Sequence, residues 1–238
     1  MIKLRMPNAE LMSNYLNTWG MIIVRPILFF TKLKEENWQK QALTFFLFSS
    51  WLLALVATVV VFVIQYVPIG RTLVEGLSGL RFVLILPVLL TLIFVFFMIT
   101  FLIIGGLFTV AFFAMLYSVA WLMHYTYLLL GGKGSFNRLC QSVFYSSAVL
   151  LDGVLILALI VLTKYGNLSY SLFRVGFNFT CFLILVFIYG LWAIAGRKTY
   201  KVAKWQAFLG ALAPILLLLI FGLLFDKIGL PHLRPWIS

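Results

Sequence analysis

Ionisable side chains are scarce in the apolar parts of this sequence, so the few that occur there are the first candidates for chemistry. Asp152 lies near the middle of the apolar run formed by residues 143–163. An ionised carboxylate at that depth in a membrane is costly unless it is paired or hydrated. Asp152 is therefore either a functional acid or a hydrogen-bonded residue that fixes helix packing beside Gly153, and the sequence leaves both roles open.

Two further polar residues, His124 and Asn178, also lie within apolar runs. Histidine titrates near neutral pH, so His124 can share a proton with an acid or bind a lipid headgroup, although donation to a neighbouring helix is its commoner role. For Asn178 we expect an interhelical hydrogen bond. If His124 and Asp152 line a path, the protein is a permease for a small solute or ion, or a subunit of one.

The sequence contains no residue pattern typical of an enzyme active site or a metal centre. Cys140 and Cys181 lack CxxC or Cys/His spacing, and there is no HExxH, paired-carboxylate or Ser/His/Asp arrangement. Residues 131–136 read Gly-Gly-Lys-Gly-Ser-Phe, but Tyr127 and Gly134 stand where a phosphate-binding loop needs a glycine and a Ser or Thr. We therefore expect a flexible turn there, and a protein that is no enzyme and uses neither cofactor nor metal.

Positive charge is concentrated in the connections between apolar runs. The chain has 18 Lys and Arg against six Asp and Glu, a net charge of +12. In a membrane protein such an excess reflects loops held at the anionic cytoplasmic leaflet rather than nucleic-acid binding. The candidate contacts for an anionic lipid or a partner protein are Lys133, Arg138, Arg197, Lys198, Lys201 and Lys204.

The elements that must position these side chains are membrane-spanning helices. Hydrophobic residues make up 64% of the chain, charged residues 10%, and the mean hydropathy is +1.12. A soluble domain has about 45–50% apolar and about 25% charged residues. The apolar runs are continuous rather than alternating, which excludes a transmembrane barrel. We predict an all-α integral membrane protein, a polytopic helical bundle.

The chain divides into a polar amino-terminal segment and an apolar remainder. Residues 1–41 are expected to form an interfacial amphipathic helix over 8–24, a break at Arg25 and Pro26, and a basic cytoplasmic collar. Residues 42–238 form the transmembrane helical domain. Its clear spans are residues 42–67, 143–163, 173–195 and 207–225, with Pro68 and Gly70 ending the first.

The number of crossings depends on residues 82–132, which contain no charged side chain. As one helix they would measure about 76 Å, too long for one crossing of about 30 Å of hydrocarbon. Either two helices cross with a turn near Gly105 and Gly106, or one crosses at 107–130 and residues 82–104 form an extra, non-crossing apolar segment. Five crossings with a cytoplasmic amino terminus place 12 basic residues inside and six outside, whereas six crossings give ten and eight. We predict five crossings, with six as the alternative.

Residues 124–136, together with Tyr-Ser-Ser-Ala at 145–148, resemble the bacterial branch of the Yip family, the Ypt/Rab-interacting membrane proteins. The most specific part of the first stretch is Gly-Gly-Lys-Gly-Ser-Phe at 131–136. Residues 25–30 ahead of the first span support the resemblance. It implies a five-span bundle in the bacterial inner membrane with a cytoplasmic amino terminus, and it supplies no established activity. The chain departs from the family in having Val149 where a proline is usual and in the added apolar length of 82–104.

Together these observations predict a non-enzymatic membrane scaffold or adaptor. Its basic cytoplasmic loops would dock anionic lipid headgroups or a partner, either another membrane protein or a second copy of the chain, and no nucleic acid is expected. The permease that uses Asp152 and His124 is the alternative.

Overall fold

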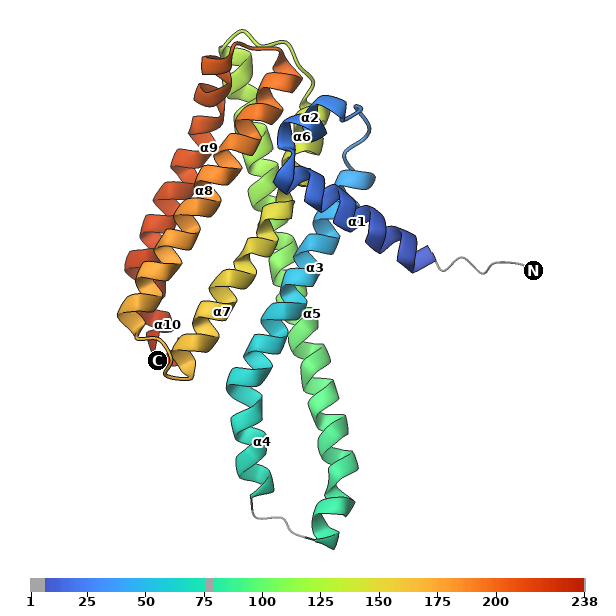
Figure 1. The fold of residues 1–238 in the computed structure, drawn as a ribbon, viewed down its shortest axis with the longest axis vertical. Helices are drawn as coiled ribbons and strands as arrows, with labels where there is room; N and C mark the ends of the chain where they lie inside the picture. The colour runs from blue at the N-terminus through green and yellow to red at the C-terminus, as the bar shows by residue number, and fades with distance from the viewer. Residues whose placement is uncertain (1–6, 76–78, 238) are drawn as a thin grey trace, which may run out of the picture. The chain divides into compact units, whose positions relative to one another are not determined.

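The computed structural model describes residues 7–75 and 79–237 of the chain. It is 88% helical, with no strand in the described residues, and five of its helices are long and apolar enough to cross a membrane (Figure 1). These spans are Gln41–Thr72, Val83–Leu129, Phe136–Lys164, Tyr170–Tyr200 and Lys204–Trp236. The prediction of an all-α polytopic membrane protein is confirmed.

The amino-terminal helices are α1 (Pro7–Val24) and α2 (Pro26–Lys32). Arg25 separates them with φ −135° and ψ 56°, a non-helical conformation that agrees with the restriction imposed by the proline that follows. Within α1 the side chains of Tyr15 and Ile22 are buried. The predicted helix over 8–24 and its break are therefore present.

The first span is longer than predicted because the helix passes Pro68 instead of ending there. It consists of α3 (Gln41–Val61), a π-helical turn η1 (Phe62–Tyr66) and α4 (Val67–Val74). The Val67 N–H donates to the carbonyl five residues earlier, that of Phe62. This wider turn spares the carbonyl four residues before Pro68 from the clash that a proline causes inside an α-helix.

A matching turn occurs in the fifth span, which consists of α9 (Lys204–Leu224), η3 (Phe225–Gly229) and α10 (Leu230–Ile237). There the Leu230 N–H donates to the Phe225 carbonyl, directly before Pro231. In both spans a π turn thus carries the helix past a proline.

The second span is one helix, α5 (Leu80–Leu129), of 50 residues (Figure 1). The turn expected near Gly105 and Gly106 in the six-crossing alternative does not form, and residues 82–104 prolong the crossing helix without a break. Gly105 instead lies against Trp51 of α3, where an added Cβ would stand 2.6 Å from Cζ3 of the indole. The glycine permits a close helix–helix approach rather than a turn.

The third span changes its helical form midway. It runs as α6 (Phe136–Tyr145), a 3₁₀ segment η2 (Ser146–Asp152) and α7 (Gly153–Lys164), and is followed by α8 (Tyr170–Tyr200). Asp152 is thus the last residue of the 3₁₀ segment. The side chains of η2 from Ser146 to Val149 are buried.

The chain forms two compact units. Unit 1 comprises residues 1–49, 114–150 and 183–222, and unit 2 comprises residues 50–113, 151–182 and 223–238. Unit 1 holds α1, α2 and α6, with the connections that follow α5 and α8, whereas unit 2 holds η1, α4, α7, η3 and α10. All six predicted basic contacts and His124 belong to unit 1, and Asp152 and Asn178 belong to unit 2.

Candidate functional site

The two basic connections predicted to dock a lipid or partner come together in unit 1. After α5 the chain turns at Gly131, where φ is 79°, and the Gly132 N–H donates to the Tyr127 carbonyl at 2.9 Å. The Lys133 N–H then donates to the carbonyl of Tyr200 at 3.2 Å. A Cβ added at Gly134 would stand 2.6 Å from the Thr199 carbonyl oxygen. Glycine is needed at this position because the two backbones approach so closely.

We call the six side chains carried by these connections the basic face: Lys133, Arg138, Arg197, Lys198, Lys201 and Lys204. Four of them are exposed, and Arg138 and Lys198 are half-buried. Among the residues that the structure describes, no carboxylate forms an ion pair with any of the six. The positive charge of the basic face is therefore not neutralised by any acidic side chain that the structure describes.

A third polar segment, residues 33–40, is bound to the start of α6. The Ser135 hydroxyl donates to the Glu35 carboxylate. Asn137 Nδ2 donates to the Glu36 carbonyl at 2.8 Å, and Gln141 Nε2 donates to the Lys34 carbonyl at 3.2 Å. These bonds attach residues 33–40, ahead of the first span, to the loop that carries Lys133 and Arg138.

Beneath the basic face, Tyr127 holds three helices together. Its side chain is fully buried, and its hydroxyl donates to the Ala207 carbonyl at 2.7 Å. A Cβ added at Gly196 of α8 or Gly210 of α9 would overlap the Tyr127 ring. The Tyr200 ring stacks on it with centroids 5.0 Å apart and an interplanar angle of 21°. The two glycines thus form the slot that the tyrosine fills.

His124 belongs to the same cluster. Its Nδ1 is hydrogen-bonded to the Tyr200 hydroxyl, and its ring lies edge-on to Phe136 with centroids 5.3 Å apart. Because His124 is on α5 and Tyr200 ends α8, the histidine makes the interhelical contact that is its commoner role. Nearby, Gln206 Nε2 donates to the Leu130 carbonyl at 3.1 Å and ties the start of α9 to the end of α5.

In unit 2, Asp152 is half-buried at the junction of η2 and α7. It caps α7 without a side-chain hydrogen bond. Gly153, the next residue, lies against Leu53 of α3, where an added Cβ would stand 3.4 Å from Cδ1. Among the described residues, Asp152 has neither a cation nor a hydrogen-bond donor as a partner.

Asn178 takes part in an ion-pair cluster that was not predicted from the sequence. Its Nδ2 donates to Asp226 Oδ1 at 3.0 Å. Arg174 binds the same carboxylate with both ends of its guanidinium, from Nε to Oδ1 at 2.9 Å and from Nη2 to Oδ2 at 2.5 Å. One feature of the sequence could have indicated this cluster. Arg174 and Asn178 are four residues apart and therefore lie on one face of α8.

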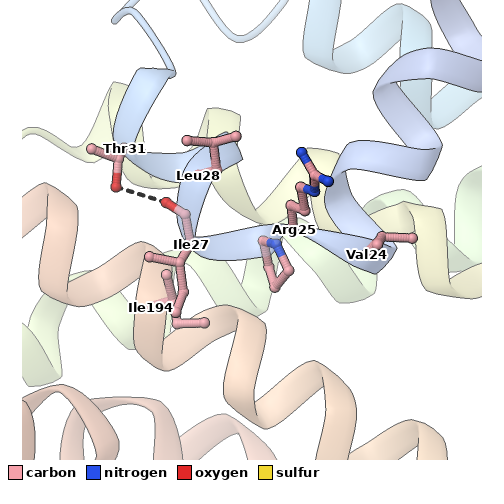
Figure 2. A pocket seen from close by; sticks show the side chains of 7 residues that line it. Val24, Arg25, Ile27, Leu28, Thr31 and Ile194 are labelled. Carbon is pink, nitrogen blue, oxygen red and sulfur yellow. Dashed lines mark hydrogen bonds between the residues drawn. The ribbon is translucent and has the colours of Figure 1, made fainter.

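Two cavities open beside α2. The first, about 440 Å³, lies at the break between α1 and α2 and has mostly apolar walls (Figure 2). It is lined by Val24, Arg25, Pro26, Ile27, Leu28, Thr31 and Ile194. The second, about 360 Å³, has a mixed lining that includes Lys32, Lys34, Glu36 and Gln141. Leu28 lines both cavities, and neither is lined by His124 or Asp152.

Comparisons with protein-family models, curated proteins and solved structures found no match.

The described residues contain no group of three or more His, Cys, Asp or Glu that could hold a metal ion. Cys140 is buried in α6 and Cys181 half-buried in α8, and both are free thiols. What the chain does offer is a fixed arrangement of positive charge at helix ends and two cavities beside a helix of the amino-terminal segment.

Proposed function

We propose that the protein is a non-enzymatic membrane scaffold whose basic face binds anionic lipid headgroups at the cytoplasmic surface. The observation that carries this proposal is the joining of the two basic connections by the Lys133–Tyr200 backbone bond, with no ion pair to any of the six cations in the described chain. The positive side chains of the connection after α5 and of the connection after α8 therefore lie on one surface.

The position of the basic face favours lipid over a soluble partner. Every one of its residues lies beside or within the end of a membrane span: Lys133 follows Leu129, Arg138 is in the first turns of α6, and the other four lie between Arg197 and Lys204. Charges at span ends stand at the depth of lipid headgroups. Each Lys or Arg near an anionic leaflet contributes about 1 kcal/mol of attraction.

The orientation is part of the same proposal. The charge rule places the basic face and the amino terminus in the cytoplasm, which in a bacterium makes the membrane the inner one. Yip-family membership also stands as a proposal on sequence alone. The two stretches that support it, residues 131–136 and 145–148, both lie in unit 1, where the first forms the turn of the basic face.

The test compares two pairs of neutral substitutions in the purified full-length protein. Lys201→Gln with Lys204→Gln removes two charges of the basic face, and Arg71→Gln with Lys227→Gln removes two exposed charges of unit 2 as the matched control. Binding of phosphatidylglycerol and phosphatidylcholine is followed by native mass spectrometry. At about 1 kcal/mol per charge, we expect the first pair to weaken phosphatidylglycerol binding roughly thirtyfold, and the control pair to change it little.

Three outcomes would contradict the proposal. Equal losses from both pairs would mean that net charge, and not this face, attracts the lipid. Unchanged phosphatidylglycerol binding in the Lys201 and Lys204 variant would remove the lipid function. If that variant instead released a co-purifying protein while lipid binding stayed constant, the face would be a protein-docking surface.

A further inference from the structure

The second cavity beside α2 is lined by side chains of both charge signs. Lys32 and Lys34 contribute two cations and Glu36 one anion, and apolar side chains such as Leu28 and Phe29 complete the wall. Its volume of about 360 Å³ lies at the lower end of the range for small-ligand sites, about 300–1,000 Å³. All three charged side chains are exposed.

These opposite charges share a cavity without pairing. None of Lys32, Lys34 and Glu36 forms an ion pair with any residue that the structure describes. A ligand that carries charges of both signs would bind all three side chains at once.

The backbone that carries two of these charges is held firmly. Gln141, only 2% exposed, donates from Nε2 to the Lys34 carbonyl at 3.2 Å and accepts from the Glu36 N–H at its Oε1 at 3.4 Å. Asn137 Nδ2 donates to the Glu36 carbonyl at 2.8 Å. One buried amide therefore fixes the spacing of Lys34 and Glu36 while their charged ends stay available. Such preorganisation lowers the entropic penalty of binding a ligand.

We propose that this cavity binds the headgroup of an aminophospholipid, which carries a phosphate and a primary ammonium. Lys32 and Lys34 bind the phosphate oxygens, and the Glu36 carboxylate accepts hydrogen bonds from the ammonium. The apolar cavity of Figure 2, which shares Leu28 with this one, offers adjoining space for an acyl chain. The site uses none of the residues of the basic face and has a zwitterionic rather than an anionic ligand.

The Glu36 carboxylate is the reason for proposing an ethanolamine headgroup rather than choline or glycerol. A choline headgroup has the same phosphate, but its quaternary nitrogen has no N–H to donate to Glu36. A glycerol headgroup has no cation at all. Hydrogen bonds to charged groups contribute enough free energy that we expect the wild-type protein to prefer ethanolamine over choline lipids about tenfold or more.

The experiment titrates the purified full-length protein in mild detergent with phosphatidylethanolamine and phosphatidylcholine of identical acyl chains, followed by native mass spectrometry. Glu36→Gln should weaken ethanolamine binding more than choline binding and so reduce the preference, because both cations lose an attractive charge but only the ethanolamine ammonium loses a charge-assisted hydrogen bond. Glu35→Gln is the matched control: Glu35 is adjacent but does not line the cavity, and a glutamine can still accept the Ser135 hydroxyl. Replacing Lys32 and Lys34 with Gln should weaken both lipids equally, because the phosphate is common to them.

A second measurement needs no variant and covers the case in which Glu36→Gln does not fold. Stepwise N-methylation of the ethanolamine lipid should weaken its binding to the wild-type protein at each step, because each methyl group removes a donor. The proposal is overturned if the wild type shows no preference for ethanolamine over choline, or if Glu35→Gln removes that preference as fully as Glu36→Gln. A larger loss of phosphatidylglycerol binding than of ethanolamine binding when Lys32 and Lys34 are replaced would also overturn it, because the cavity would then prefer an anionic lipid. The Lys201 and Lys204 pair should leave the ethanolamine preference intact, so this proposal and that of the basic face can fail separately.

Discussion

Replacing Gly196 with alanine should destabilise the protein by filling the slot that holds Tyr127. The added methyl group would overlap the Tyr127 ring and hydroxyl. The ring cannot retreat, because Gly210 of α9 lies against it and Tyr200 stacks on it. Overpacking of this kind costs about 1–3 kcal/mol. Displacing the hydroxyl from the Ala207 carbonyl adds about 1 kcal/mol. We expect a loss of about 2–4 kcal/mol in the free energy of unfolding, and a similar loss for Gly210→Ala.

Thermal unfolding in mild detergent measures the effect, with two matched glycines as controls. Gly190 lies on α8 and Gly222 on α9, and nothing stands within 4 Å of a Cβ added at either position. Alanine there should leave stability unchanged or raise it by up to about 1 kcal/mol, because alanine favours helix more than glycine does. For a chain of this length about 1 kcal/mol corresponds to roughly 2–4 °C, so Gly196→Ala should lower the unfolding midpoint by roughly 4–16 °C.

A double-mutant cycle identifies the cause of the loss. Tyr127→Ala alone should be destabilising because it leaves a cavity. In that background Gly196→Ala should cost little or nothing, since the ring it would strike is gone, and the two changes should couple by about 1–3 kcal/mol. Additive effects, or a Gly196→Ala midpoint equal to that of Gly190→Ala, would refute the close packing of Tyr127 between the two glycines.

Three further predictions concern polar groups. Tyr15→Phe should cost about 1 kcal/mol by removing the 2.8 Å hydrogen bond with Ser49. Burial raises the pKa of the Tyr15 phenol. The unfolded chain therefore loses this proton first as pH rises past about 10, so thermal melts above that pH should show a smaller alkaline loss of stability for Tyr15→Phe than for wild type. The Ser147 hydroxyl is buried without a hydrogen-bond partner in the described chain, so Ser147→Ala should leave the melting midpoint equal or higher. Asp226→Ala leaves its two partners on α8 unpaired and should lower the midpoint, whereas Lys227→Ala should not; equal midpoints would contradict the importance of that cluster.

The sequence predicted the helical membrane class and most spans because continuous apolar runs have no other stable form in a bilayer. It could not resolve residues 82–104, since this stretch has no charged side chain to mark a turn. The pair Gly105 and Gly106 suggested a turn because glycine often ends helices. The structure uses Gly105 for close approach to Trp51 instead, and the two uses of glycine are identical in a single sequence.

The candidate site was predictable in part. The six residues of the basic face were identified from charge, but their convergence depends on the Lys133–Tyr200 backbone bond, which no side-chain pattern encodes. The ion pair of Arg174 and Asp226 joins residues 52 positions apart. It was missed because Asp226 follows directly after the expected end of the fifth span. The cavity lined by Lys32, Lys34 and Glu36 was not predicted, because in the sequence those residues indicated only a basic cytoplasmic segment ahead of the first span.

The π turns at η1 and η3 limit how the lengths of their spans can change during evolution. A π turn holds one residue more than an α turn, and each added residue rotates the rest of a helix by about 100°. Deleting one residue of η1 would bring the Pro68 ring against the carbonyl four positions earlier. It would also move the Val63 carbonyl away from the Tyr165 hydroxyl, which now donates to it at 3.2 Å. The extra residue and the proline must therefore be gained or lost together, so a relative that lacks the proline should also be one residue shorter between 62 and 66.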